Sequence, residues 1–244
     1  MRPLNDAVFM SVFYPQSKWH LLLSELRNTL KRVDITREAK RVLIFLNRNR
    51  GENIRLVIEF NSDNKENILG KISKSIRHFI SPNPANYSSP KNPSTNFFAD
   101  FPTNEVYYNL FNERYLKYET AAIVQEHLSQ IALDFFAITA VNKQTVSALI
   151  GHLNWSLLKE LLHNLNGKRT VIACVHANLA ATDLDKTQHE NLLKENPMMV
   201  KPFENFGKAA HKLIIENGHT KTAYEELMQL IQMQLGELSP QIVE

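Results

Sequence analysis

The stretch FNERYLKYET, residues 111–120, places Arg114 between a run that predicts a strand and a run that predicts a helix. An arginine in a cleft binds carboxylates well, because its planar guanidinium offers paired donors and keeps its charge. We therefore expect Arg114 to be an anion clamp. The alternative is a surface ion pair with Glu113 or Glu119.

A second arginine, Arg55, lies inside NIRLVIEF, residues 53–60, which reads as a strand. With a period of two, Arg55 shares one face with Val57 and Glu59, while the opposite face is apolar. Arg48 belongs to the preceding hairpin tip, which is expected to be solvated. Arg55 is thus the more promising of the two as a buried cation.

The third candidate stretch is TVIACVHANLAATD, residues 170–183, where His176 and Asn178 interrupt an apolar run. A buried polar side chain needs a hydrogen-bond partner, so at least one of the two is expected near the core with a partner. His176 could be a base or an orienting group, or a histidine with a purely structural role. The C-x-H pair with Cys174 is too small for zinc, so we expect no metal.

Composition sets further limits on the function. The 244 residues, 43% of them hydrophobic, can bury a substantial core. The net charge of +3 comes from basic residues spread along the chain, which does not favour nucleic-acid binding. With one cysteine, no signal peptide and no long apolar run, we expect a cytoplasmic protein without a membrane span. Walker and dinucleotide motifs are absent, and no cofactor is expected.

The elements that must position these residues alternate in the first half of the chain. Apolar, branched runs predict strands at 7–14, 41–47, 53–60 and 105–111, and apolar residues at helical spacing predict helices at 17–33 and 63–79. The order βαββαβ is that of a ferredoxin-like antiparallel sheet with both helices on one face. We therefore predict an α+β fold.

From residue 119 onward the pattern is helical, with further helices expected near 144–165, 172–180, 186–194, 203–216 and 222–235. Thr222 and Glu225 stand at capping-box spacing before the last of these. We divide the chain into an α+β subdomain, 1–116, and a helical subdomain, 117–244, which could also form one compact domain.

Three stretches together resemble one protein family. They are SVFYPQSKWHLLLSEL, then VLIFLNRNRGENIRLVIEF, and then NERYLKYETAAIVQEHL, followed by a weaker match in ACVHANLAATD. In order and spacing the sequence resembles the C-terminal, glutamate-eliminating domain of lantibiotic dehydratases and the related thiopeptide-type bacteriocin biosynthesis proteins. The resemblance spans most of residues 7 to 185.

The resemblance implies a lyase that removes glutamate from glutamylated Ser or Thr of a precursor peptide. A chain of this size lacks room for the glutamylating domain, so a separate glutamylating dehydratase subunit is the expected partner. By resemblance the catalytic residues are Arg114, Arg55 and His176, and the substrate-binding residues are Arg48, Tyr115 and Asn178.

Two alternatives remain within the same pathway. The chain departs from the family pattern at Asn47, at Leu116 and Lys117, and at Leu179, positions where the family has arginines or glycines. Such changes are compatible with a thiopeptide-type cycloaddition enzyme, or with a non-catalytic scaffold that binds the peptide. An RNA-recognition motif has the same element order, but its stacking aromatics are missing from residues 53–60 apart from Phe60.

Overall fold

The computed structural model describes residues 7–48, 50–61, 64–86, 101–110, 119–162, 169–218 and 220–236. The chain folds into two compact units. The first comprises Met1–Arg114 with Ala132–Val141, and the second comprises Tyr115–Ile131 with Asn142–Glu244. The boundary expected between residues 116 and 117 falls outside the described residues.

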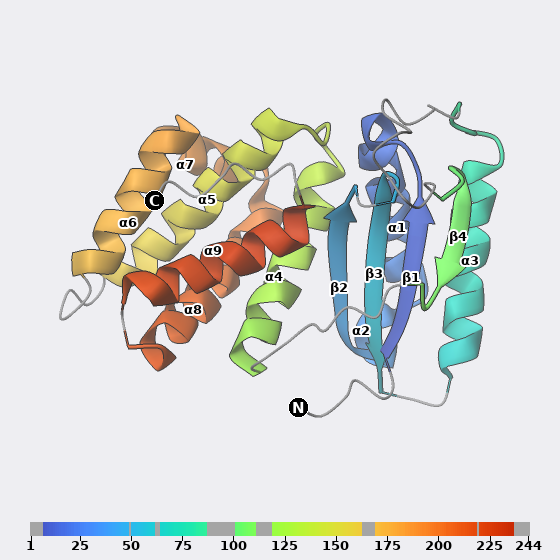
Figure 1. The fold of residues 1–244 in the computed structure, drawn as a ribbon, viewed down its shortest axis with the longest axis horizontal. Coiled ribbons are helices and arrows are strands. Elements are labelled where there is room, and N and C mark those ends of the chain that lie inside the picture. The colour runs from blue at the N-terminus through green and yellow to red at the C-terminus, as the bar shows by residue number, and fades with distance from the viewer. Residues whose placement is uncertain are drawn as a thin grey trace. The chain divides into compact units, whose positions relative to one another are not determined.

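The first unit contains a four-stranded antiparallel sheet with the order β2-β3-β1-β4 (Figure 1). This is the ferredoxin-like topology, and it confirms the predicted α+β fold. β3 has the predicted limits, and β4 ends near Asn109, a residue with positive φ (51°). The strands are β1 (Ala7–Phe13), β2 (Ala39–Asn47), β3 (Asn53–Phe60) and β4 (Glu105–Tyr108).

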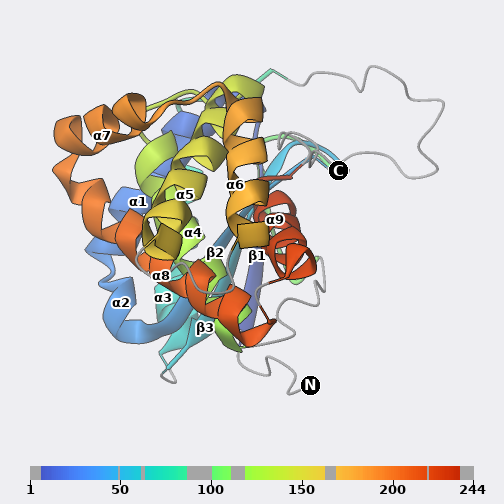
Figure 2. The same cartoon turned by 90° about the vertical axis from the view of Figure 1, so that its left-hand side faces the viewer.

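Both long helices of the first unit, α1 (Trp19–Arg32) and α3 (Lys65–Ile80), lie on one face of the sheet (Figures 1 and 2). Their buried residues recur at three- and four-residue spacing, as in Leu22 and Leu26 or Ile72 and Ile76. A short turn, η1 (Gln16–Lys18), precedes α1, and α2 (Ile35–Glu38) follows it. The alternate residues of the strands, such as Leu56 of β3, complete this core.

The hairpin between β2 and β3 depends on Gly51, which has a φ of 110°. Only glycine adopts this conformation readily. A Cβ atom at this position would also lie 3.3 Å from the ring of Phe13, so the glycine lets the turn approach β1 closely. The turn thereby fixes the register in which β3 begins.

The second unit is helical, and its helices match those expected from the apolar spacing. Asp185 begins α7 with a complete capping box to Gln188. The cap of α9 is Thr220, whose hydroxyl accepts a hydrogen bond from the backbone of Ala223, so the prediction that Thr222 forms the cap was wrong. The elements are α4 (Glu119–Phe136, whose last residues belong to the first unit), α5 (Lys143–Leu162), α6 (Arg169–Thr182), α7 (Lys186–Glu195), η2 (Pro197–Met199), α8 (Val200–Glu216) and α9 (Lys221–Leu235).

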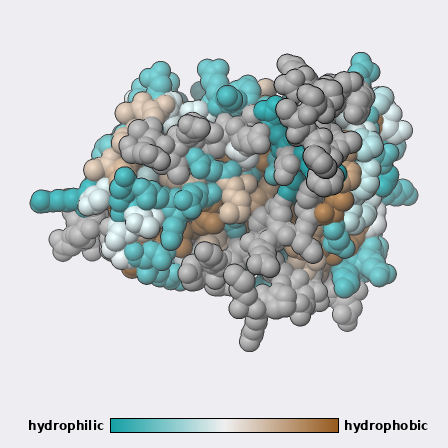
Figure 3. Space-filling model, in the orientation of Figure 1, coloured by the Kyte–Doolittle hydropathy of each residue, from teal (hydrophilic) through white to brown (hydrophobic). Residues whose placement is uncertain are grey.

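On the face drawn in Figure 3, much of the described surface is hydrophilic, and hydrophobic residues form smaller groups. Exposed large hydrophobic side chains, such as Met198 (63%) and Ile138 (57%), occur at separate places in the sequence. Within the described ranges, every helix is too short or too polar to cross a bilayer.

Candidate functional site

Arg55 is the third residue of β3, and its side chain lies on the face of the sheet opposite α1 and α3. In the sheet register it stands between Ser11 of β1 and Phe45 of β2. Arg55 is 6% exposed, and both neighbours are buried as well. We call the surface formed by Ser11, Phe45, Asn53 and Arg55 the Arg55 face.

Asn53 orients the guanidinium of Arg55. The Arg55 Nε atom donates a hydrogen bond of 2.9 Å to Asn53 Oδ1, and Asn53 Nδ2 donates one of 2.6 Å to the carbonyl of Gly51. Burial lowers the pKa of Arg55 to about 10. Because this pKa is still well above neutral pH, the side chain stays cationic.

A second buried arginine, Arg41 of β2, lies toward the other end of the same face. Its Nη1 atom is 3.3 Å from Glu59 Oε2, and the two residues are direct partners in the sheet register. Lys40 also pairs with Glu59, but from an exposed position. The single carboxylate of Glu59 therefore offsets part of the positive charge at this end of the face. Arg55 donates its Nε hydrogen bond to the neutral Asn53.

Aromatic side chains gather beside the hairpin turn. The rings of Phe13, Phe101 and Tyr107 have centroids between 5.0 and 5.7 Å apart. The guanidinium carbon of Arg50 lies 4.5 Å from the centroid of Phe101, a cation–π contact. This cluster packs the turn that carries Gly51, and so it supports the position of Asn53 indirectly.

The predicted residues Arg48, Arg114 and Tyr115 are less informative. Arg48 is exposed and directly follows the last residue of β2. Arg114 and Tyr115 lie outside the described residues, so their predicted roles stay predictions.

In the second unit, α6 carries both polar residues, His176 and Asn178, of which at least one was expected near the core. His176 is exposed, while Asn178 is buried and donates a hydrogen bond to the carbonyl of Cys174. Residues two positions apart point to different sides of a helix. The expectation that one of them lies near the core with a partner is confirmed for Asn178.

The second unit also buries a pair of histidines that was not predicted from the sequence. His152 Nδ1 of α5 lies 3.1 Å from His189 Nδ1 of α7, and the ring of Phe203 packs against both. Burial, together with the neighbouring His189, lowers the pKa of His152 to about 3. Among the described residues no group of three or more His, Cys, Asp or Glu is arranged to hold a metal ion.

Comparison with known proteins adds one relationship. No family model and no curated protein matches the sequence. The solved structure of a pyridine synthase, TbtD, from thiomuracin biosynthesis is similar, with a TM-score of 0.59 and 10% sequence identity over 96% of this chain and 92% of that chain. The fold is shared with this enzyme. At such low identity the similarity establishes the fold alone, and the predicted dehydratase function stays a prediction.

The guanidinium of Arg55 has the chemistry to bind an anionic group, since a guanidinium pairs with carboxylates and oxyanions, and more strongly where the dielectric constant is low. Arg55 was predicted from the sequence, but Asn53 was missed. The period of two that placed Arg55 on its face puts Asn53 on the same face, and this was the available signal.

Proposed function

We propose that the protein modifies a ribosomally made precursor peptide in a thiopeptide-type pathway, by removing glutamate from glutamylated Ser or Thr. The observation that carries the proposal is the buried, charged Arg55, held in one orientation by Asn53. The fold shared with a pyridine synthase from thiomuracin biosynthesis supports the kind of pathway.

The proposed reaction needs a cation near the reacting group. A base takes the α-proton of the glutamylated Ser, the Cβ–O bond breaks, and glutamate leaves with the Ser oxygen, so that dehydroalanine remains. A positive group stabilises both the enolate and the departing carboxylate. We assign this role to Arg55 together with Arg114, and we name His176 as the candidate base.

The proposal includes a partner and a compartment. A separate glutamylating subunit would prepare the substrate, because the reaction starts from a glutamyl ester that this chain is not proposed to make. Arg48, Tyr115 and Asn178 are proposed to bind the peptide. We place the reaction in the cytosol and assign it no cofactor.

A second candidate reaction is a cycloaddition between two dehydroamino acids of the peptide, which forms a six-membered nitrogen ring. The observation that favours it is the shared fold with a protein described as a pyridine synthase. A cationic Arg55 would then polarise a peptide carbonyl, where charge builds up in the transition state. A third candidate is a scaffold that binds the peptide without any reaction.

Mass spectrometry of a peptide bearing glutamylated Ser, incubated with the purified protein, tests the proposal. We expect the wild type to convert this Ser to dehydroalanine, and Arg55→Lys and Arg114→Ala each to slow the conversion by at least about ten-fold. Arg37→Ala, on the exposed surface of α2, is the matched control and should leave the rate unchanged.

A peptide with two dehydroalanines serves as the second substrate. Ring formation on this peptide, without any elimination on the first, would replace the proposal with the cycloaddition. Binding of both peptides without a change of mass would support the scaffold instead.

A further inference from the structure

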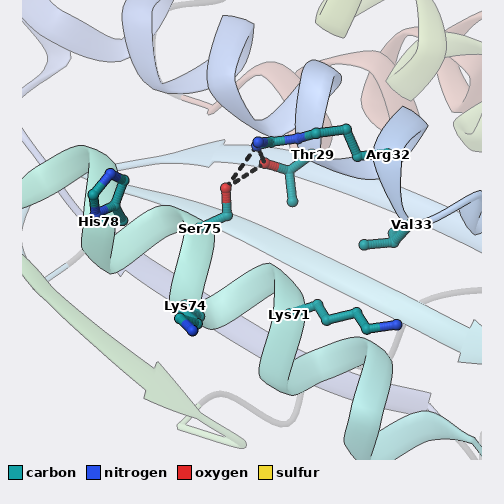
Figure 4. A pocket seen from close by; sticks show the side chains of 7 residues that line it. All are labelled: Thr29, Arg32, Val33, Lys71, Lys74, Ser75 and His78. Atoms are coloured by element: carbon teal, nitrogen blue, oxygen red, sulfur yellow. Dashed lines mark hydrogen bonds between the residues drawn. The ribbon is translucent and has the colours of Figure 1, made fainter.

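A groove runs between α1 and α3 of the first unit (Figure 4). Its volume is about 530 Å³. Since both helices lie on the face of the sheet opposite Arg55, the groove is separate from the Arg55 face. The lining residues are Thr29, Arg32, Val33, Lys71, Lys74, Ser75 and His78.

A hydrogen-bond network holds Arg32 across the groove. Its Nη2 atom donates to Glu25 Oε1 at 2.6 Å, to Thr29 Oγ1 at 2.8 Å and to Ser75 Oγ at 2.8 Å. Ser75 donates in turn to Glu25 over 2.7 Å, so that α1 and α3 are joined at this point. Figure 4 shows Arg32 reaching from α1 toward Ser75 on α3.

Glu25 is committed to this network and stays ionised. Burial on its own would raise the pKa of Glu25, but the hydrogen bonds from Ser75 and Thr29 and the charge of Arg32 outweigh this effect and lower the pKa. The hydrogen bonds that Arg32 donates within the network all use Nη2, and its side chain is 62% exposed. The remaining edge of the guanidinium is therefore available to an anion from solution.

Two lysines and a histidine line the α3 side of the groove. Lys71, Lys74 and His78 are spaced by three and four residues, so they lie on one side of the helix and span about 10 Å. All three are exposed, and none has an ion pair or side-chain hydrogen bond within the part of the chain that the structure describes. Several exposed lysines of the second unit, by contrast, pair with glutamates, as Lys159 does with Glu204.

This arrangement fits one class of ligand. A row of basic side chains about 10 Å long is better matched by a chain with several charges than by a single ion, and about four residues of extended peptide span that length. None of the residues that line the groove is Phe, Tyr or Trp, so the bases of a single-stranded nucleic acid would have only the imidazole of His78 to stack on. Carboxylates also match the fork of Arg32.

We propose that the groove between α1 and α3 is a binding site for an acidic peptide segment, whose carboxylates pair with Arg32, Lys71 and Lys74. This inference does not depend on the reaction proposed above, because it uses no residue of the Arg55 face. Exposed charge pairs are screened by salt, so the binding is expected to be strong only at low ionic strength.

Fluorescence anisotropy of a labelled peptide of alternating Glu and Gly, titrated with the full chain, tests the site. We expect saturable binding at low salt that is lost at high salt, and no binding of the matching Gln–Gly peptide. The double variant Lys71→Glu/Lys74→Glu should raise the Kd by about ten-fold or more. The control Lys201→Glu/Lys208→Glu, on exposed positions of α8, makes the same charge change and should leave the Kd within about two-fold.

Three results would overturn the proposal. The first is no saturable binding of the Glu–Gly peptide to the wild type. The second is an equal loss of binding in both double variants, which would reflect net charge alone. The third is tighter binding of a single-stranded RNA of similar length, lost in Lys71→Glu/Lys74→Glu, which would assign the groove to nucleic acid. Thermal melts of the variants check that each is folded, and the glutamylated-peptide assay reports on the proposed reaction separately.

Discussion

Asn53 accepts a hydrogen bond from Arg55, two residues further along β3, and donates one to the carbonyl of Gly51 in the preceding turn. The turn at Gly51 therefore orients the side-chain amide of Asn53, and this amide orients the guanidinium of Arg55. Asn53 is fully buried, so its amide is shielded from bulk solvent. The orientation of the candidate catalytic arginine is thus coupled to the conformation of a hairpin at the end of its own strand.

Replacing Asn53 should disturb this coupling. We expect Asn53→Ala to lower the free energy of unfolding by roughly 1–3 kcal/mol, because a buried donor loses its partner. Under the proposed function it should also reduce the rate of dehydroalanine formation by about ten- to a hundred-fold, with a smaller effect on peptide binding. Asn53→Asp keeps the acceptor for Arg55 and should restore part of the rate. An unchanged rate in Asn53→Ala would remove Asn53 from the site.

Arg41 and Lys40 both pair with Glu59 but differ in burial, so we expect them to contribute differently to the free energy of unfolding. Arg41 has a side chain 7% exposed and Lys40 one 52% exposed. Glu59→Ala should therefore destabilise the fold by about 3 kcal/mol, since it removes the carboxylate partner of a buried cation. Lys40→Ala should cost less than about 1 kcal/mol. Urea denaturation of the two variants measures both values, and equal effects would contradict this account.

Two glycines in helices offer a matched pair of alanine substitutions. A Cβ at Gly207 of α8 would lie 2.6 Å from the carbonyl oxygen of Ser156 in α5, whereas a Cβ at Gly70 of α3 would meet nothing within 4 Å. We expect Gly207→Ala to lower stability by about 1–3 kcal/mol through overpacking. Gly70→Ala should raise it by roughly 0.5–1 kcal/mol, since alanine favours the helix. Thermal melts of the two variants test this prediction. If Gly207→Ala and Gly70→Ala shifted the melting temperature in the same direction, the close packing of α8 against α5 at Gly207 would be contradicted.

The pair of His152 and His189 predicts a loss of stability in acid. Burial lowers the pKa of His152 to about 3 and that of His189 to about 4, both below the value of about 6.5 in an unfolded chain. Between these values the unfolded state binds more protons than the folded state. The free energy of unfolding should therefore fall as the pH drops below about 6.5, by up to about 1.4 kcal/mol per pH unit for each histidine.

The groups around the pair act in opposite directions on His189, because Glu190 raises its pKa and Lys159 lowers it. Chemical denaturation at several pH values tests the prediction. His189→Leu should flatten the pH dependence between about pH 4 and 6.5, and His78→Gln, at an exposed position, should not change it. The same slope in the wild type and in His189→Leu would show that other groups are responsible.

The sequence by itself determined the four strands, the longer helices and their order. Strand β3 and helix α3 follow from local periodicity, because a strand repeats every two residues and a helix about every 3.6. Because only a few ways of connecting consecutive helices and strands occur in folds, the order βαββαβ was enough to predict the ferredoxin-like sheet. The residue at which a helix begins was harder to predict. Thr222 has the spacing of a capping box, but Thr220 forms the N-cap of α9.

The tertiary structure alone decided which distant side chains meet. Ser75 and Glu25 are 50 positions apart in the sequence, and His152 and His189 are 37 apart, yet each pair is hydrogen-bonded. No periodicity in either segment contains this information, because the meeting points depend on how helices pack and not on how each one forms. The burial of Arg55 was likewise undecided in the sequence, since a period of two assigns a residue to a face without saying whether water reaches that face.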